Sequence, residues 1–351
     1  MSNSRQLNKR LFFGVAVLFC FIVAACGELS SQTVYLNGKT MGTTYHITLP
    51  SLTDHTQQEL AIIVQQELDA VDQAMSTYKS DSIVSLYNAA QVGQVVAADE
   101  ATLFVVKQAL GFAEDSAGAF NPAIGPLVNL WGFGPSVLAD DQIPSEYEIQ
   151  QALAQSDYRA IVVHHNGLGK TAPVSLDLSA IAKGYGVDVV AEHLLELGIT
   201  DFMVEVGGEL RLQGNSPRGS IWRIGIESPG EAFGIPFEAI LISNKAVATS
   251  GDYRNYFEAD GVRYSHTIDP SSGYPIKHKL ASVTVVADTS ATADALATAI
   301  SVMGPERGME FSRNRALAVF MLVKSDDGFV AQYTQAFEAY LELPDANGVI
   351  Q

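Results

Sequence analysis

The chain has 351 residues, 47% of them apolar, and its formal net charge at pH 7 is −18. So acidic a protein repels the phosphate backbones of nucleic acids, which argues against nucleic-acid binding. An anionic ligand would therefore need a metal ion or basic residues at its own site.

The N-terminal segment predicts export. The first ten residues hold three cations and no acid, and the next fifteen carry no charge, too short a run for a membrane-spanning helix. Small residues precede Cys26, as in the processing box of a lipoprotein. We expect a signal peptide over residues 1–25, a lipid on Cys26 and a spacer over 26–36. The alternative is an uncleaved anchor helix, and either arrangement places the body outside the cytoplasm.

Cysteine usage limits the mature chain. The sequence has two cysteines: Cys26 would carry the lipid, and Cys20 lies in the segment that is to be removed. A structural disulfide and a metal site of thiolates are then both excluded.

Apolar periodicity predicts the elements in chain order. Helical spacing from Leu60 to Met75 predicts a helix over 56–78. Further helices are expected over 103–116, 185–197 and 291–303. Strands are expected near 37 and over 44–49, 160–164, 174–178, 202–206, 222–226, 239–243, 282–287 and 316–323. Residues 120–135, rich in Gly, Pro and aromatics, predict an ordered loop or short turns.

Strands and helices mix without a regular βαβ repeat, which predicts an α+β fold. We expect one large mixed-sheet domain of two intimate lobes over residues 37–345, long enough to bury a sizeable core.

The segment Asp288–Thr298 contains a pair of oxygen-bearing side chains. On a helix, Asp294 and Thr298 are four residues apart and project from one face. A carboxylate and a hydroxyl are hard ligands of the kind Mg²⁺ prefers. Two ordinary polar residues on a solvated helix are the alternative.

Residues 176–186 run from a strand into a helix through small residues, with Lys183 at the first turn. A helix N-terminus with a lysine favours an anionic ligand. A tight turn that uses glycine only for packing is equally compatible.

A third segment contains His266, shortly before an Asp-Pro-Ser-Ser-Gly turn. Histidine in such a loop can act as a general base. It can also simply fix the loop. No Ser-His-Asp constellation, P-loop or dinucleotide fingerprint occurs in the sequence, and Gly207-Gly208 lacks the rest of that fingerprint.

Taken together, these segments resemble the ApbE family of FAD:protein FMN transferases. The matching pieces, in family order, are Lys39–Thr43, Met75–Tyr78, Gly118–Phe120 with Gly125–Gly134, Asp177–Gly184, Val206–Glu209, Thr249–Arg254, His266–Pro270 and Asp294–Thr298.

The resemblance implies that FAD donates FMN to a threonine or serine of a target protein, with release of AMP. It implies FAD contacts from Met41, Tyr78, Gly118, Ala119, Phe120, Asp177, Lys183 and Ile268. It implies an Mg²⁺ shell of Asp294, Thr298 and the backbone carbonyl of Ala180. His266 is the candidate base for the acceptor hydroxyl. One departure is Asn121, where the family often has an aspartate.

Two other functions remain open. The same site could let water attack, which would make the chain an Mg²⁺-dependent FAD diphosphatase. A non-catalytic lipoprotein that stores FAD is the third possibility. For the transferase, we expect membrane redox subunits as acceptors and a lipid anchor on the periplasmic side of the inner membrane, with the outer membrane still open.

Overall fold

The computed structural model describes residues 33–52, 54–135, 143–230, 236–251, 256–259 and 262–342. The predicted signal peptide, Cys26 and most of the spacer lie outside these ranges, as do residues 252–254 of the matching piece Thr249–Arg254. Within them, no helix combines the length and the apolar character that crossing a membrane requires.

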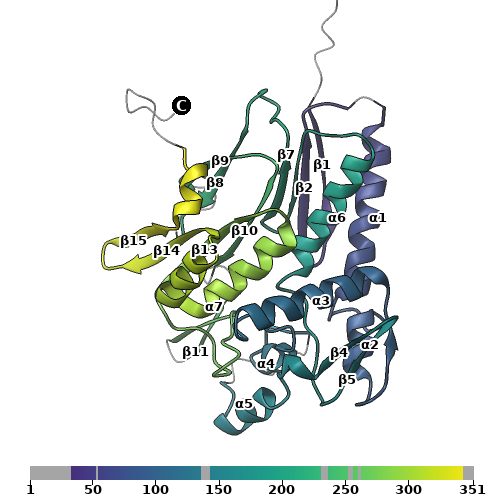
Figure 1. Cartoon of the computed structure of the whole chain (residues 1–351), viewed down its shortest axis with the longest axis vertical. Coiled ribbons are helices and arrows are strands. Elements are labelled where there is room, and N and C mark those ends of the chain that lie inside the picture. The colour runs from purple at the N-terminus through teal and green to yellow at the C-terminus, as the bar shows by residue number, and fades with distance from the viewer. Residues whose placement is uncertain are drawn as a thin grey trace, which may run out of the picture. The chain divides into compact units, whose positions relative to one another are not determined.

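An eight-stranded sheet is the frame of the domain (Figure 1). In spatial order its strands are β1 (Val34–Thr40), β2 (Thr43–Leu49), β6 (Phe202–Val206), β7 (Glu209–Gln213), β10 (Lys245–Gly251), β13 (Leu280–Ala287), β14 (Ala318–Ser325) and β15 (Gly328–Tyr333). Each neighbouring pair is antiparallel, where we expected a mixed sheet. The α+β class is confirmed. Two-residue connections join β1 to β2, β6 to β7 and β14 to β15, and such short connections allow only antiparallel neighbours.

Three smaller sheets accompany the main one. They consist of β3 (Val96–Ala97), β5 (Gly167–Lys170) and β4 (Ile161–His164); of β8 (Trp222–Glu227) and β9 (Pro236–Ile242); and of β11 (Tyr256–Ala259) and β12 (Val262–Ser265).

Helices cover one face of the main sheet (Figure 1). In chain order, all the helices of the described residues, including those away from the main sheet, are α1 (Gln57–Met75), α2 (Ile83–Ala89), α3 (Glu100–Asp115), α4 (Gly125–Leu130), α5 (Glu146–Leu153), α6 (Ala182–Glu196) and α7 (Ser290–Asn314), with 3₁₀ turns η1 (Tyr158–Ala160) and η2 (Gln335–Tyr340). Helix α6 packs on β6 and β7, and α7 packs on β10 and β13. The two helices also pack on each other, which brings their N-terminal turns together.

The central strands are buried on both faces. In β14, Val319 and Met321 face α7, whereas Phe320 and Leu322 pack with β8, β9 and η2. Alternation along a strand explains this division, because successive side chains point to opposite faces. Burying both faces fixes the register of the strands under the two helices.

The strongest helix prediction is confirmed. Helix α1 begins after Thr56, whose hydroxyl accepts from the backbone N–H of Glu59 while the Glu59 carboxylate accepts from that of Thr56. Such a capping box satisfies two N–H groups that the helix leaves free. Helix α7 has a kink at Gly304, beside the predicted end of the 291–303 helix, and continues to Asn314.

One strand prediction is wrong. Residues 174–178 form no strand, and β4 pairs instead with Gly167–Lys170. The two glycines of β5 have no side chain, so this strand lacks the alternation of apolar and polar residues from which a strand is predicted. They are needed there: a Cβ on Gly167 would overlap the backbone of Val96 in the neighbouring β3. Residues 120–135, predicted as a loop, also contain the short helix α4, with Pro126 in its first turn.

Candidate active site

A cavity of about 790 Å³ lies where α6, α7, β7 and β10 meet, a size typical of small-molecule sites. Among its described lining residues, Lys183 is the one lysine or arginine. The same lining contains five acids: Asp177, Glu205, Glu209, Glu227 and Asp294. The cavity is therefore strongly anionic.

Two hydrogen bonds of Asp177 fix the turn that precedes α6. The Asp177 carboxylate accepts from the backbone N–H of Ser179 at 2.8 Å, and the Asp177 N–H donates to the carbonyl of Pro122 at 2.8 Å. Helix α6 then begins without a side-chain cap, because Ile181 occupies the capping position. The N–H groups of its first turn find other partners: that of Ala182 donates to the Leu178 carbonyl at 2.8 Å, and that of Gly184 donates to Asp294.

Close packing of α6 on α7 requires Gly184. A Cβ at this position would overlap the backbone carbonyl of Ser290 in α7. The approach lets the Gly184 N–H donate to the Asp294 carboxylate at 3.1 Å. Asp294 thus accepts a bond from the other helix's N-terminus, where the helix dipole favours a negative charge.

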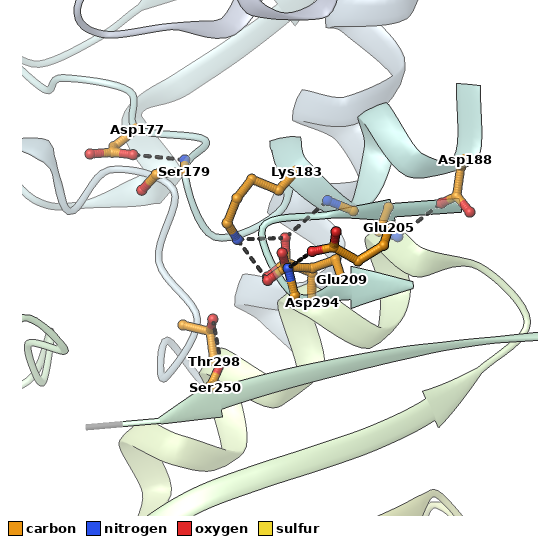
Figure 2. Close-up of polar contacts among 12 residues, drawn as sticks. Asp177, Ser179, Lys183, Asp188, Glu205, Glu209, Ser250, Asp294 and Thr298 are labelled. Carbon is orange, nitrogen blue, oxygen red and sulfur yellow. Dashed lines mark hydrogen bonds and ion pairs between the residues drawn. The ribbon is translucent and has the colours of Figure 1, made fainter. Parts of the chain in front are cut away.

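Lys183, Glu209 and Asp294 form a buried ionic group (Figure 2). The Lys183 ammonium lies 2.7 Å from a Glu209 oxygen and 3.7 Å from an Asp294 oxygen. Burial raises the pKa of Glu209 above its usual value; the ammonium of Lys183 opposes this shift and Asp294 adds to it. Burial alone lowers the pKa of Lys183, but the two carboxylates outweigh it and hold that pKa above its usual value. Lys183 therefore stays charged.

Thr298 lies one turn along α7 from Asp294, and both line the cavity. Its hydroxyl is 3.4 Å from that of Ser250 in β10 (Figure 2). Ala180, which precedes α6, lines the same cavity. These groups supply hard oxygens of the kind that Mg²⁺ prefers, in an acidic cavity, so the residues present fit that ion. Among the described residues, no three or more His, Cys, Asp or Glu side chains are grouped so that they could hold a metal ion together.

We call Lys183, Glu209, Asp294 and Thr298 the charged wall. The aromatic wall consists of Tyr78, Phe133, His266 and Ile268, which line another part of the cavity.

Rings dominate the aromatic wall. The Tyr78 hydroxyl donates to the Phe133 carbonyl at 3.2 Å, and its side chain is 68% exposed. The rings of Phe133 and His266 meet edge to face with centroids 6.3 Å apart. Ile268 is buried. An exposed ring beside apolar groups suits a flat aromatic ligand.

Most predicted site residues meet at this cavity. The ones that line it are Tyr78, Ala119, Phe120, Asp177, Ala180, Lys183, His266, Ile268, Asp294 and Thr298.

Met41 and Gly118 are not among the described lining residues. Met41 has a left-handed backbone, with φ of 46°, and packs against the core beside Gly186 of α6. Gly118 also has a positive φ, of 85°, and turns the chain toward Ala119 and Phe120. Both shape the backbone next to the cavity rather than line it.

Sequence reasoning missed the acids of the β6–β7 hairpin. The Glu205 carboxylate accepts from the Gly208 N–H and from His46, each at 2.6 Å, and Glu209 pairs with Lys183. Taken from the sequence alone, the Gly207-Gly208 pair between these acids is only an incomplete dinucleotide-binding fingerprint. Its positive φ angles, with a carboxylate on either side, mark a hairpin turn in a sheet.

Asn121 braces its own loop. Its side-chain amide donates to the Ser156 carbonyl and its oxygen accepts from the Ala123 N–H, both at 2.8 Å. An uncharged residue therefore satisfies both contacts at the position where an aspartate is common in the resembling family.

Comparison with known proteins agrees with this geometry. The solved structure titled "Flavin Transferase ApbE from Vibrio cholerae" matches with a TM-score of 0.82 at 41% identity, over 89% of this chain and 100% of that one. A Thermotoga maritima ApbE protein matches with a TM-score of 0.80 at 31% identity, over 88% of this chain and 99% of that one. The fold is that of flavin transferases.

Sequence relatives give the family. The model of the ApbE family matches residues 41–321. An "FAD:protein FMN transferase" of Vibrio cholerae is 43% identical over 331 residues, which is 93% of this chain and 98% of that protein. One from Haemophilus influenzae is 38% identical over 95% and 99%. The chain belongs to the ApbE family.

Proposed function

We propose that this chain transfers FMN from FAD to a threonine or serine hydroxyl of a target protein, with Mg²⁺ bound at the charged wall. The chain is an FAD:protein FMN transferase, as are curated relatives that match it over nearly their whole length.

The observation that carries the metal is the charge of the cavity. Its described lining has five acids and one lysine, yet FAD brings a diphosphate. The diphosphate and the carboxylates carry like charges, which repel each other strongly in a cavity from which water is displaced. A divalent cation on the oxygens of Asp294, Thr298 and Ala180 would offset that repulsion.

Bound Mg²⁺ would neutralise charge on the diphosphate as the bond to AMP breaks. The chain's own residues do the remaining work. Lys183 holds phosphate oxygens, and Tyr78 lies against the isoalloxazine ring.

His266 would accept the proton of the acceptor hydroxyl. The hydroxyl oxygen forms a bond to the phosphorus of the FMN half, and the bond from that phosphorus to the AMP oxygen breaks. AMP leaves, and the acceptor retains FMN through a phosphoester.

Attack by water in place of the acceptor would give an FAD diphosphatase with the same site. A storage lipoprotein would hold FAD without turnover. The charged wall favours a reaction over storage, because tight binding of FAD alone does not need a buried acid with a cation and a hydroxyl arranged around it.

The lipid anchor and the acceptors also belong to this proposal. Lipidation of Cys26 would tether the domain on the periplasmic side of the inner membrane, within reach of membrane redox subunits. Palmitate labelling of cells that produce the chain or its Cys26→Ala variant tests the anchor, and the variant should lose both label and membrane association.

The activity is tested with the full chain, FAD, Mg²⁺ and a threonine-bearing acceptor domain, by intact mass. A mass gain of one FMN on the acceptor, abolished by EDTA and by replacing the acceptor threonine with alanine, is the expected result. Free FMN and AMP with unmodified acceptor would mean hydrolysis. Unchanged FAD would contradict both reactions.

A further inference from the structure

Lys183 stands between two carboxylates, and it is closer to one of them. Its ammonium lies at hydrogen-bond distance from Glu209, 2.7 Å, and at 3.7 Å from Asp294. The longer separation is an ion pair without a good hydrogen bond. Asp294 therefore keeps an oxygen face that Lys183 does not cap.

The turn before Glu209 fixes the path of the lysine. Gly207 has a φ of 59°, and a Cβ there would lie 3.3 Å from the Cδ of Lys183. The aliphatic stem thus runs along the glycine turn and ends at the carboxylate of the residue two positions later. Backbone shape and the Glu209 charge direct the ammonium to the same place.

Charge balance gives this arrangement a consequence for metal binding. Two carboxylates and one ammonium leave a net charge of about −1 in the group, which attracts a cation. Without Glu209, the ammonium and Asp294 would neutralise each other, and Lys183 would be free to close on Asp294. A divalent cation would then have to displace it.

Stability does not account for Glu209. The side chain is 5% exposed, and its second oxygen has no hydrogen-bond partner among the described residues. A buried carboxylate with an unsatisfied oxygen costs free energy of folding, and a buried ion pair is often no more stabilising than an apolar pair. A function at the site explains why a charge is kept there.

We propose that Glu209 is a positioning residue that holds Lys183 away from Asp294 and thereby keeps the Asp294 carboxylate available to a divalent cation. This inference rests on the metal site of the proposed function.

The test is binding of Mn²⁺, a stand-in for Mg²⁺, to the purified full chain without FAD, followed by electron paramagnetic resonance of the free ion. Glu209→Gln, nearly the same shape without the charge, should raise the Mn²⁺ dissociation constant about tenfold or more. Glu205→Gln is the matched control. It removes an acid from the same cavity but leaves both partners of Lys183, so the constant should change by no more than about twofold.

A double variant separates positioning from direct coordination. If Glu209 acts through Lys183, then Lys183→Met combined with Glu209→Gln removes the competing ammonium and restores tighter Mn²⁺ binding than Glu209→Gln alone. A double variant as weak as the single one would make Glu209 a ligand and overturn the proposal.

The remaining outcomes separate this inference from the metal site itself. Wild-type affinity in folded Glu209→Gln, as judged by circular dichroism, would overturn the inference and leave the metal site standing. Absence of Mn²⁺ binding by the wild-type chain would overturn both.

Discussion

The charged wall and the aromatic wall of the cavity differ in how deeply their side chains are buried. Asp294 and Glu209 are 3% and 5% exposed, and their carboxylates, from α7 and β7, both contact groups of α6. Tyr78, on the aromatic wall, is 68% exposed and follows the C-terminal end of α1. The acids of the charged wall are preorganised by packing, whereas Tyr78 of the aromatic wall is accessible to solvent.

The difference follows from what each wall has to do. Stabilising charge at a breaking phosphate bond requires fixed dipoles and ions, because their reorganisation would cost free energy during the reaction. A flavin ring needs only a flat apolar surface, and an acceptor protein needs open space. Variants of the charged wall should therefore change the rate, and variants of the aromatic wall should change the affinity for FAD.

The largest effect is expected for Asp294→Asn. The amide oxygen can still accept from the Gly184 N–H, so the variant removes the charge and keeps the shape. We expect the turnover number for acceptor flavinylation to fall on the order of a thousandfold. Quantifying modified acceptor by mass against time measures it. A decrease of less than about tenfold would contradict a metal role for this residue.

The support of the charged wall is tested by Asp188→Ala. The Asp188 carboxylate accepts from the N–H groups of Ser290 and Ala291 at the start of α7, and it pairs with Arg211. Removing it leaves two buried N–H donors unpaired and takes away the more buried of the two carboxylates that pair with Arg211, so we expect the free energy of unfolding to fall by about 3 kcal/mol. Urea denaturation measures this change.

Glu192→Ala is the control for Asp188→Ala. Glu192 contacts the same guanidinium of Arg211, but its side chain is 60% exposed. We expect a loss of no more than about 1 kcal/mol. Equal losses for the two variants would show that α7 is not anchored through Asp188.

A smaller effect is expected on the aromatic wall. Tyr78→Ala removes a ring worth about 1 kcal/mol of stacking, so KM for FAD should rise about fivefold with little change in kcat. Tyr78→Phe loses only the exposed bond to the Phe133 carbonyl and should change KM by about threefold or less. Steady-state kinetics with varied FAD separates the two constants. A fall in kcat at constant KM would assign Tyr78 to the charged, rate-determining part of the site.

The smallest effect is expected for Asn121→Asp, which introduces the residue common in the family. A carboxylate in place of the amide would face the Ser156 carbonyl and lose that hydrogen bond. We expect stability to decrease by about 1 kcal/mol and kcat/KM to gain nothing. Thermal unfolding and transfer rates measured together check this. An increase in kcat/KM would show that a charge at this loop serves the reaction.

Prediction from the sequence succeeded where one element carries the signal. The periodicity of α1, the helical spacing of Asp294 and Thr298, and the lysine at the start of α6 are all local. The resemblance to the ApbE family then predicted most of the lining residues, whereas the spacing within each motif did not decide between a functional and a structural role.

Prediction failed where contacts between distant elements decide. Glu209 meets Lys183 only because β7 lies beside α6, which no local pattern reveals. Strand β5 was hidden by glycines that a neighbouring strand requires. Met41 carries the family motif, yet packing places it against α6 rather than in the lining.

In the proposed function, the charged wall binds the metal and the aromatic wall binds the flavin. A crystal of the chain soaked with Mn²⁺ and FAD, measured for anomalous scattering, tests it most directly. The account predicts an anomalous peak within about 2.3 Å of oxygens of Asp294 and Thr298, with the flavin ring beside Tyr78. A metal peak elsewhere, or a flavin ring lying against Lys183 and Asp294, would contradict it.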